Sequence, residues 1–168
     1  INLDSNAKSL LNNKLREEED FNTFVQKARE IRNDSYSSKE LDDFCTKLLD
    51  TLPSRRLFKL QALSAYHLAF SQNACNFSVP GAGKTSIVYG AYSYLKSLGE
   101  NNGKYVNKIV VIGPLSSFVP WEDEYFECFG VKPKSFKFSS VNSYEDKKNV
   151  LRGITSESYD LFLFSYPI

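Results

Sequence analysis

Residues 78–86 read SVPGAGKTS, and the fold that we expect depends on this stretch. Gly81 and Gly83 carry no bulky side chains, so the backbone N–H groups around them can face the phosphates of a nucleotide. Lys84 is long enough to reach between the outer two phosphates, and the hydroxyl of Thr85 can bind Mg²⁺. The stretch therefore predicts a phosphate-binding loop for ATP and Mg²⁺, with Lys84 as the catalytic lysine and Thr85 as the metal ligand.

The pattern around this lysine is specific. A run of G-x-G-K-[ST] arises by chance at about one position in 30,000, so fewer than ~1% of chains of this length would contain it. Residues 74–79 predict a short buried strand before the loop, and residues 84–98 predict the helix that comes after it. Ser78 stands where the full pattern usually has its first glycine. The nucleotide-binding residues expected within the loop are Pro80, Gly81, Ala82, Gly83, Lys84, Thr85 and Ser86.

Strands and helices alternate downstream of the loop. Residues 108–113, KIVVIG, are a continuous apolar run, which is typical of a central parallel strand covered on both faces. Further elements are predicted by apolar spacing and capping residues: an edge strand at 135–138, a strand at 160–164, and helices at 60–70, at 116–130 (capped by Ser116 or Ser117) and at 143–152. This alternation predicts an α/β fold in which helices cover both faces of a mostly parallel sheet.

Residues 1–54 form a different kind of sequence, polar and charged with apolar positions at helical spacing. Ser37 or Ser38 can cap a second helix there, and Pro53 ends it. We therefore expect two regions: a small N-terminal helical region at 1–54 and a nucleotide-binding lobe at 55–168, with the first packed on the second.

Composition sets limits on function. The chain has 168 residues, 42% of them hydrophobic, which suits one ordinary domain with a small appendage. A net charge of +1 gives no overall attraction to nucleic acid or acidic membranes. Cys45, Cys75 and Cys128 are widely separated and His67 is the single histidine, so we expect buried free thiols and no zinc site. No apolar run approaches the ~20 residues that span a bilayer, so we expect no membrane partner.

Three segments together resemble the first RecA-like lobe of superfamily-two helicases and translocases, and most closely the Swi/Snf-like branch that moves along double-stranded DNA. The resemblance covers about residues 55–168. The first segment contains Gln61, which precedes Lys84 by 23 residues (84 minus 61), where the family keeps a glutamine that reads adenine. An amide offers a donor and an acceptor together, as the edge of adenine requires. The resemblance thus adds Gln61 to the nucleotide-binding residues.

The other two segments resemble parts of the family that touch the nucleic-acid backbone. They are IVVIGPLSSFVPWEDEY at 109–125 and YDLFLFSY at 159–166. The serines after the first strand can bind a phosphate through their hydroxyl and N–H groups, and they can equally serve as simple helix caps. The nucleic-acid contacts that the resemblance implies are Pro114, Ser116, Ser117, Ser165 and Tyr166.

The resemblance also implies parts that these residues do not include. The family's Asp-Glu pair should come after the strand that ends at Ser165 and Tyr166, and a second RecA-like lobe supplies an arginine finger. A first residue Ile1 and the lack of any Met predict a piece of a longer protein. We expect the parent to be an intracellular ATP hydrolase, in the cytoplasm or in the nucleus if eukaryotic, and this piece alone to be inactive. Two alternatives stay open: a P-loop ATPase and a nucleotide-sensing module, neither acting on nucleic acid.

Overall fold

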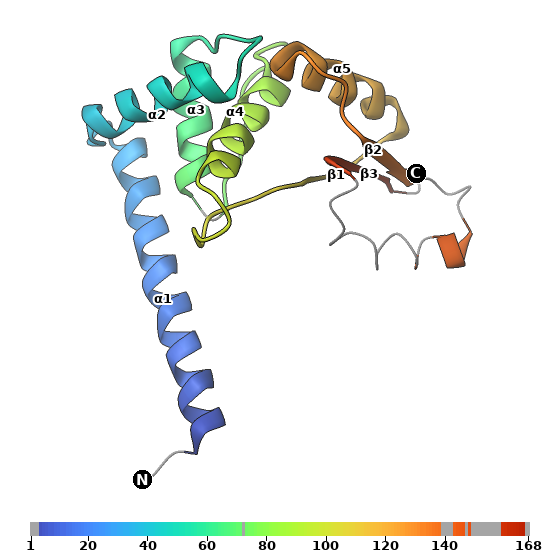
Figure 1. Cartoon of the computed structure of the whole chain (residues 1–168). Helices are drawn as coiled ribbons and strands as arrows, with labels where there is room; N and C mark the ends of the chain where they lie inside the picture. Colours follow the sequence, from blue (N-terminus) through green and yellow to red (C-terminus); the bar gives the residue numbers. More distant parts are fainter. Residues whose placement is uncertain (1–3, 72, 139–142, 147, 149–158, 167–168) are drawn as a thin grey trace.

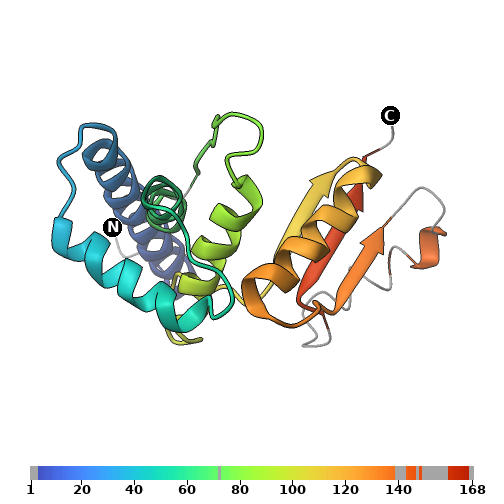
Figure 2. The same ribbon diagram turned by 90° about the horizontal axis from the view of Figure 1, so that it is seen from above.

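A computed structural model describes residues 4–71, 73–138, 143–146, 148 and 159–166 of the chain. A helical region precedes a small three-stranded parallel sheet, which makes a mixed α/β fold (Figure 1). In Figure 2 the helices α1 to α4 form one half of the molecule, and the sheet with α5 forms the other. The elements in chain order are α1 (Ser5–Arg32), α2 (Ser38–Thr51), α3 (Lys59–Phe70), α4 (Lys84–Ser97), β1 (Ile109–Gly113), the short 3₁₀ turn η1 (Leu115–Ser117), α5 (Phe118–Phe129), β2 (Ser135–Phe138) and β3 (Leu161–Ser165).

Several helix ends agree with the capping signals in the sequence. The Ser37 side chain accepts a hydrogen bond from the Glu40 N–H at 3.3 Å, so the predicted cap of α2 is confirmed. Pro120 lies in the first turn of α5, where the missing N–H costs nothing. Gly130 ends the same helix in the left-handed conformation, with φ of 71°. These short-range signals were correct because each acts within a few residues of chain.

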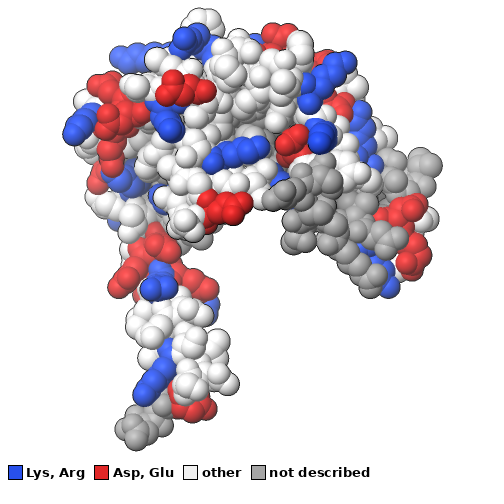
Figure 3. Space-filling model, viewed as in Figure 1, with Lys and Arg blue, Asp and Glu red and all other residues white. Residues whose placement is uncertain are grey.

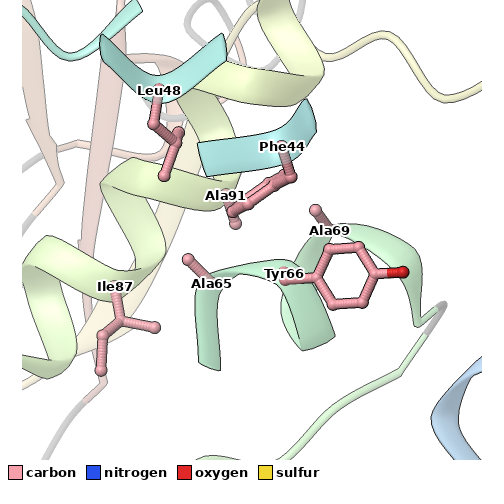
Figure 4. Packing of buried hydrophobic residues seen from close by; sticks show 7 residues of the cluster. All are labelled: Phe44, Leu48, Ala65, Tyr66, Ala69, Ile87 and Ala91. Carbon is pink, nitrogen blue, oxygen red and sulfur yellow. The ribbon is translucent and has the colours of Figure 1, made fainter. Parts of the chain in front are cut away.

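The main core joins α2, α3 and α4. It consists of Phe44, Leu48, Ala65, Tyr66, Ala69, Ile87 and Ala91 (Figure 4). A partly buried network adds α1, because Lys27 Nζ lies 2.5 Å from Glu40 Oε2 and the Tyr66 hydroxyl donates to the same oxygen at 3.0 Å. The hydrogen bond from Lys27 lowers the pKa of Glu40. The core therefore runs across residue 54, where the sequence predicts a boundary between two regions.

The sheet is built around β3. The strand order is β1-β3-β2 and both pairings are parallel. Leu161, Phe162 and Leu163 of β3 are fully buried. Helix α5 covers one face, where Phe118 and Trp121 pack in a cluster with residues of β1 and β3. The prediction that 135–138 is an edge strand is confirmed by β2.

The prediction that 108–113 is a central strand covered on both faces is wrong. Among the described strands β1 lies at an edge of the sheet, and its side chains Val110 and Ile112 are 53% and 71% exposed. An apolar run shows that a strand has two apolar faces, but strand order depends on which neighbours pair with it. Here β3, from the far end of the sequence, takes the central place.

The buried strand predicted at 74–79 is also wrong, because these residues form no strand and Phe77 is 92% exposed. Asn76 Oδ1 accepts hydrogen bonds from the Ser78 N–H at 3.0 Å and from its hydroxyl at 2.6 Å. Such local bonds satisfy the backbone without a neighbouring strand, and no described strand pairs with this segment. The predicted helix at 143–152 begins with Ser143, whose hydroxyl accepts from the Asp146 N–H at 3.1 Å, and the rest lies largely outside the described residues.

Candidate nucleotide-binding site

The phosphate loop forms the turn that leads directly into α4. Gly81 and Gly83 have φ angles of 81° and 77°, which side-chain-bearing residues rarely adopt. A hydrogen bond of 3.2 Å from the Ala82 N–H to the Val79 carbonyl closes the turn. Gly83 is the N-cap residue of α4, and the N–H groups of a first helical turn have no acceptor within the helix. This end of α4 therefore offers backbone donors and a positive dipole end to an anion.

Gln61 lies against this loop, as the register with Lys84 predicts. Its Nε2 donates to the Ala82 carbonyl at 3.0 Å, and its Oε1 accepts from the Phe58 N–H at 3.0 Å. A Cβ added at Gly83 would come within 2.5 Å of Gln61 Nε2, so a side chain at residue 83 would displace the glutamine amide. An amide has two donors and two acceptor sites, so each end of Gln61 keeps one for a further partner. Its reading of adenine stays a prediction.

Lys84 and Ser86 make contacts in different parts of the molecule. Lys84 Nζ donates to the Val79 carbonyl at 3.0 Å, so the lysine lies folded over its own loop. Thr85 is half-buried at the start of α4. The Ser86 side chain is fully buried and its hydroxyl donates to Glu124 of α5. Of the predicted nucleotide-binding residues, Ser86 therefore has only its backbone N–H left for a phosphate.

These residues fit a magnesium-bound triphosphate. Gly81 has nothing within 4 Å of an added Cβ, and neither glycine brings a side chain of its own to the loop. The Lys84 ammonium and the Thr85 hydroxyl supply the cation and the oxygen ligand that such a group needs. In the part of the chain that the structure describes, no cluster of three or more His, Cys, Asp or Glu residues could hold a metal by itself. The chain's ligand for Mg²⁺ would thus be Thr85.

Glu124 joins the loop helix to α5, and it was not among the residues predicted from the sequence. Besides Ser86, its Oε1 meets Arg55 Nη1 at 3.4 Å and lies 3.9 Å from Cys128 Sγ. Burial raises the pKa of the Cys128 thiol to about 12, which keeps it protonated as a donor to the carboxylate. Trp121, Glu124 and Cys128 recur at helical spacing, which could have shown a carboxylate on the packed face of α5.

A second contact strengthens the connection between α4 and α5. The Tyr89 hydroxyl donates to the Trp121 carbonyl at 2.6 Å, and the two rings meet edge to face with centroids 5.4 Å apart. Tyr89 is fully buried, and that burial raises its pKa. Helix α4 therefore connects the phosphate loop to α5, and α5 begins directly after the Pro-Leu-Ser-Ser turn.

The predicted nucleic-acid residues meet at one end of the sheet. Gly113, which precedes Pro114, pairs with Ser165, so the carboxyl ends of β1 and β3 lie side by side. The Ser117 hydroxyl donates to the Pro114 carbonyl at 2.7 Å and gives α5 no side-chain cap. Ser116 and Tyr166 are exposed. In Figure 2 these strand ends and the loop before α4 lie toward the same side of the molecule.

The cysteines differ from the expectation of buried thiols. Cys128 is buried, Cys45 is half-buried, and Cys75 is exposed. All three are free thiols. Cys75 is exposed because the segment 74–79 is not the buried strand that the sequence predicts.

Comparison with known proteins gives no assignment, since neither the protein-family models nor the curated proteins include a match to this chain. Among the described residues, no helix combines the length and the apolar character that crossing a membrane requires.

We expect Glu124→Ala to lower the free energy of unfolding by about 1 to 2 kcal/mol, because it leaves the buried Ser86 hydroxyl without its acceptor. Urea unfolding monitored by the fluorescence of Trp121, the single tryptophan, measures this change. Glu127→Ala is the matched control, since Glu127 is exposed on the same helix and should change stability by less than about 0.5 kcal/mol. Equal effects of the two variants would show that the Glu124 contacts contribute nothing.

Proposed function

We propose that this chain is the nucleotide-binding part of an ATP-driven motor, the first RecA-like lobe of a superfamily-two helicase or translocase of the Swi/Snf-like kind. One observation carries the proposal. Gln61, in the register that this family uses, donates to the loop carbonyl of Ala82 and packs on Gly83. A loop that merely connects a segment to a helix has no need for a glutamine from a separate helix at this place.

The residues would act by binding and orientation. Backbone donors at the start of α4 hold the phosphates, and Lys84 leaves the Val79 carbonyl to meet their outer oxygens. Magnesium-bound ATP supplies the phosphoryl group for transfer. Transfer also requires the acidic pair and the second lobe that the family resemblance implies for the motor. The 168-residue chain should therefore bind nucleotide weakly without appreciable hydrolysis.

The coupling to nucleic acid would pass through α5. A change at the phosphate loop moves α4, and α4 is joined to α5 by the Ser86–Glu124 and Tyr89–Trp121 contacts. Helix α5 starts at the turn that contains Ser116 and Ser117, next to Ser165 and Tyr166. Double-stranded DNA is the partner that the Swi/Snf-like resemblance implies.

Replacing Lys84 by alanine tests the proposal. The Lys84 ammonium group is the only side-chain cation among the expected loop residues. Lys84→Ala should therefore weaken ATP binding by about 100-fold while the fold stays the same. Titration of a fluorescent ATP analogue with Mg²⁺ measures the affinity. Lys47→Ala, an exposed lysine on α2, is the control and should bind like the unaltered chain. Equal affinities for all three chains, or no binding by the unaltered chain, would reject the proposed function.

One observation favours the alternatives that do not act on nucleic acid. The Ser117 hydroxyl donates within its own turn to Pro114, which leaves one phosphate donor fewer on that surface. A P-loop ATPase or a nucleotide-sensing module needs no such surface. Duplex DNA distinguishes these functions, because only a motor that has both lobes should hydrolyse ATP faster when the DNA is added.

A further inference from the structure

Helix α1 projects from the molecule as an arm. It runs over 28 residues, none of them buried, and its first half extends away from every other element (Figure 1). Large apolar side chains on this arm face solvent: Leu10, Leu11, Leu15 and Phe21 are 49% to 67% exposed. Isolated helices are marginal in water and gain most of their stability from packing. A largely polar helix of this length that leaves several large apolar side chains exposed is therefore expected to have a partner.

The apolar positions of α1 have the spacing of a two-helix seam. Steps of four and three residues alternate along one side of the helix, as in a heptad repeat. The residues at these steps are Ala7, Leu11, Lys14, Glu18, Phe21, Val25 and Ala28. Leu10 and Leu15 flank this seam on its two sides and widen it. Only Lys14 and Glu18, in the middle, are charged, and a charged seam position restricts which pairings are allowed.

The order of these residues is symmetrical about Arg16. Leu11 and Phe21 lie equally far from it in opposite directions, and so do Lys14 and Glu18. In an antiparallel pair of α1 helices centred on Arg16, each Lys14 faces Glu18 of the second copy, and each Leu11 faces Phe21 of that copy. A parallel pair would instead place lysine against lysine and glutamate against glutamate.

The charges outside the seam agree with the antiparallel arrangement. Lys8 and Arg16 are basic, and the acidic residues Glu17, Glu19 and Asp20 follow directly after them in the sequence. Figure 3 shows acidic groups gathered around the upper part of the arm, while the part nearer its free end carries both basic and acidic groups. Antiparallel pairing sets the basic segment of one helix against the acidic segment of the other, and two-fold symmetry makes every such contact twice.

We propose that α1 is a dimerisation arm that pairs with a second copy of this chain as an antiparallel coiled coil. Arg29 and Arg32 lie in the last turn of α1, outside the part of the seam in which Lys14 and Glu18 determine the direction of pairing. The part of α1 that packs on α3 is its C-terminal end, so the seam from Ala7 to Phe21 stays accessible. The proposal is independent of nucleotide binding.

Sedimentation equilibrium of the 168-residue chain tests this pairing. The chain should be largely dimeric at about 100 µM, above the micromolar dissociation constants common for small interfaces. Lys14→Glu and Glu18→Lys should each weaken the dimer by about tenfold or more, because each creates two like-charge pairs. The double variant Lys14→Glu, Glu18→Lys restores both opposite-charge pairs and should dimerise like the unaltered chain.

Arg16→Glu is the matched control. Arg16→Glu and Lys14→Glu each put a glutamate four residues before an acidic residue of the same helix, Asp20 and Glu18 respectively. Residue 16, however, lies on the side of α1 that faces away from the seam. Arg16→Glu should weaken the dimer far less than either seam reversal, because residue 16 lies outside the seam, and circular dichroism of all variants checks that α1 stays helical. A monomeric unaltered chain at this concentration overturns the proposal. So does a dimer that tolerates both single reversals, or one that the double variant fails to recover.

Discussion

A chain in which Gly83 is replaced by alanine should lose about 2 to 3 kcal/mol of unfolding free energy and most of its affinity for nucleotide. Two costs combine at this position. The backbone has φ of 77°, a conformation that costs an alanine about 1 to 2 kcal/mol. The new Cβ would also lie 2.5 Å from Gln61 Nε2 and push the glutamine off the Ala82 carbonyl.

Gly99→Ala separates the two costs. Gly99 has nearly the same φ, 78°, but an added Cβ there meets nothing within 4 Å. Its loss should be limited to the backbone cost of about 1 to 2 kcal/mol, with nucleotide affinity unchanged. In a Gln61→Ser background the extra loss caused by Gly83→Ala should shrink, because the clashing atom is gone. If Gly83→Ala and Gly99→Ala behave alike in urea unfolding, the contact between Gln61 and the loop does not matter.

Phe44→Ala should destabilise the chain by about 3 to 5 kcal/mol, a large part of the stability of an ordinary domain. Phe44 is 1% exposed. Its ring packs against Tyr66 and Phe70 of α3 and against Tyr94 of α4, with ring centroids 5.5, 6.3 and 4.7 Å away. Truncation therefore removes a side chain that joins three helices, and leaves a cavity among them.

The same variant tests the boundary predicted at residue 54. Far-UV circular dichroism reports mainly on the helices, whereas the fluorescence of Trp121 reports on α5 and the sheet. If the chain is one cooperative unit, Phe44→Ala should lower both midpoints equally. Two separate regions would show a lowered midpoint by circular dichroism and an unchanged one by fluorescence. Leu49→Ala, 52% exposed on the same helix, should change neither by much.

The local features of the candidate site were predictable from nearby residues. Gly81 and Gly83 need left-handed backbone angles at a loop that opens a helix, and α4 does begin at Lys84. Gln61 was singled out only through the family resemblance, which sets its register with Lys84. Glu124 was not, because its role depends on the buried Ser86 and on Arg55, which lie far from it in the sequence.

The errors have a common cause. Both predictions treated a short run with apolar residues as a buried strand, yet 74–79 forms no strand and 108–113 lies at an edge of the described sheet. The intrinsic preference of a residue for strands is too weak to form a strand, or to set its place in a sheet, without neighbouring strands that pair with it. For 74–79 the Asn76 side chain offers the backbone local hydrogen bonds, and these compete with a strand.

The amino-acid order alone specifies the features that act over a few residues: the Ser37 cap of α2, the end of α5 at Gly130, the glycine turn before α4, the alternation of helices with strands, and the symmetrical charge order of α1. The predicted cap of α5 by Ser116 or Ser117 is not formed, because the Ser117 hydroxyl donates to the Pro114 carbonyl instead. Long-range packing sets the order of the three strands, the burial of Ser86 against Glu124, and the exposure of Val110 and Phe77. The difference is one of range. Caps and turns satisfy backbone groups with nearby atoms, whereas burial and strand order depend on which distant segments compete for the same partner.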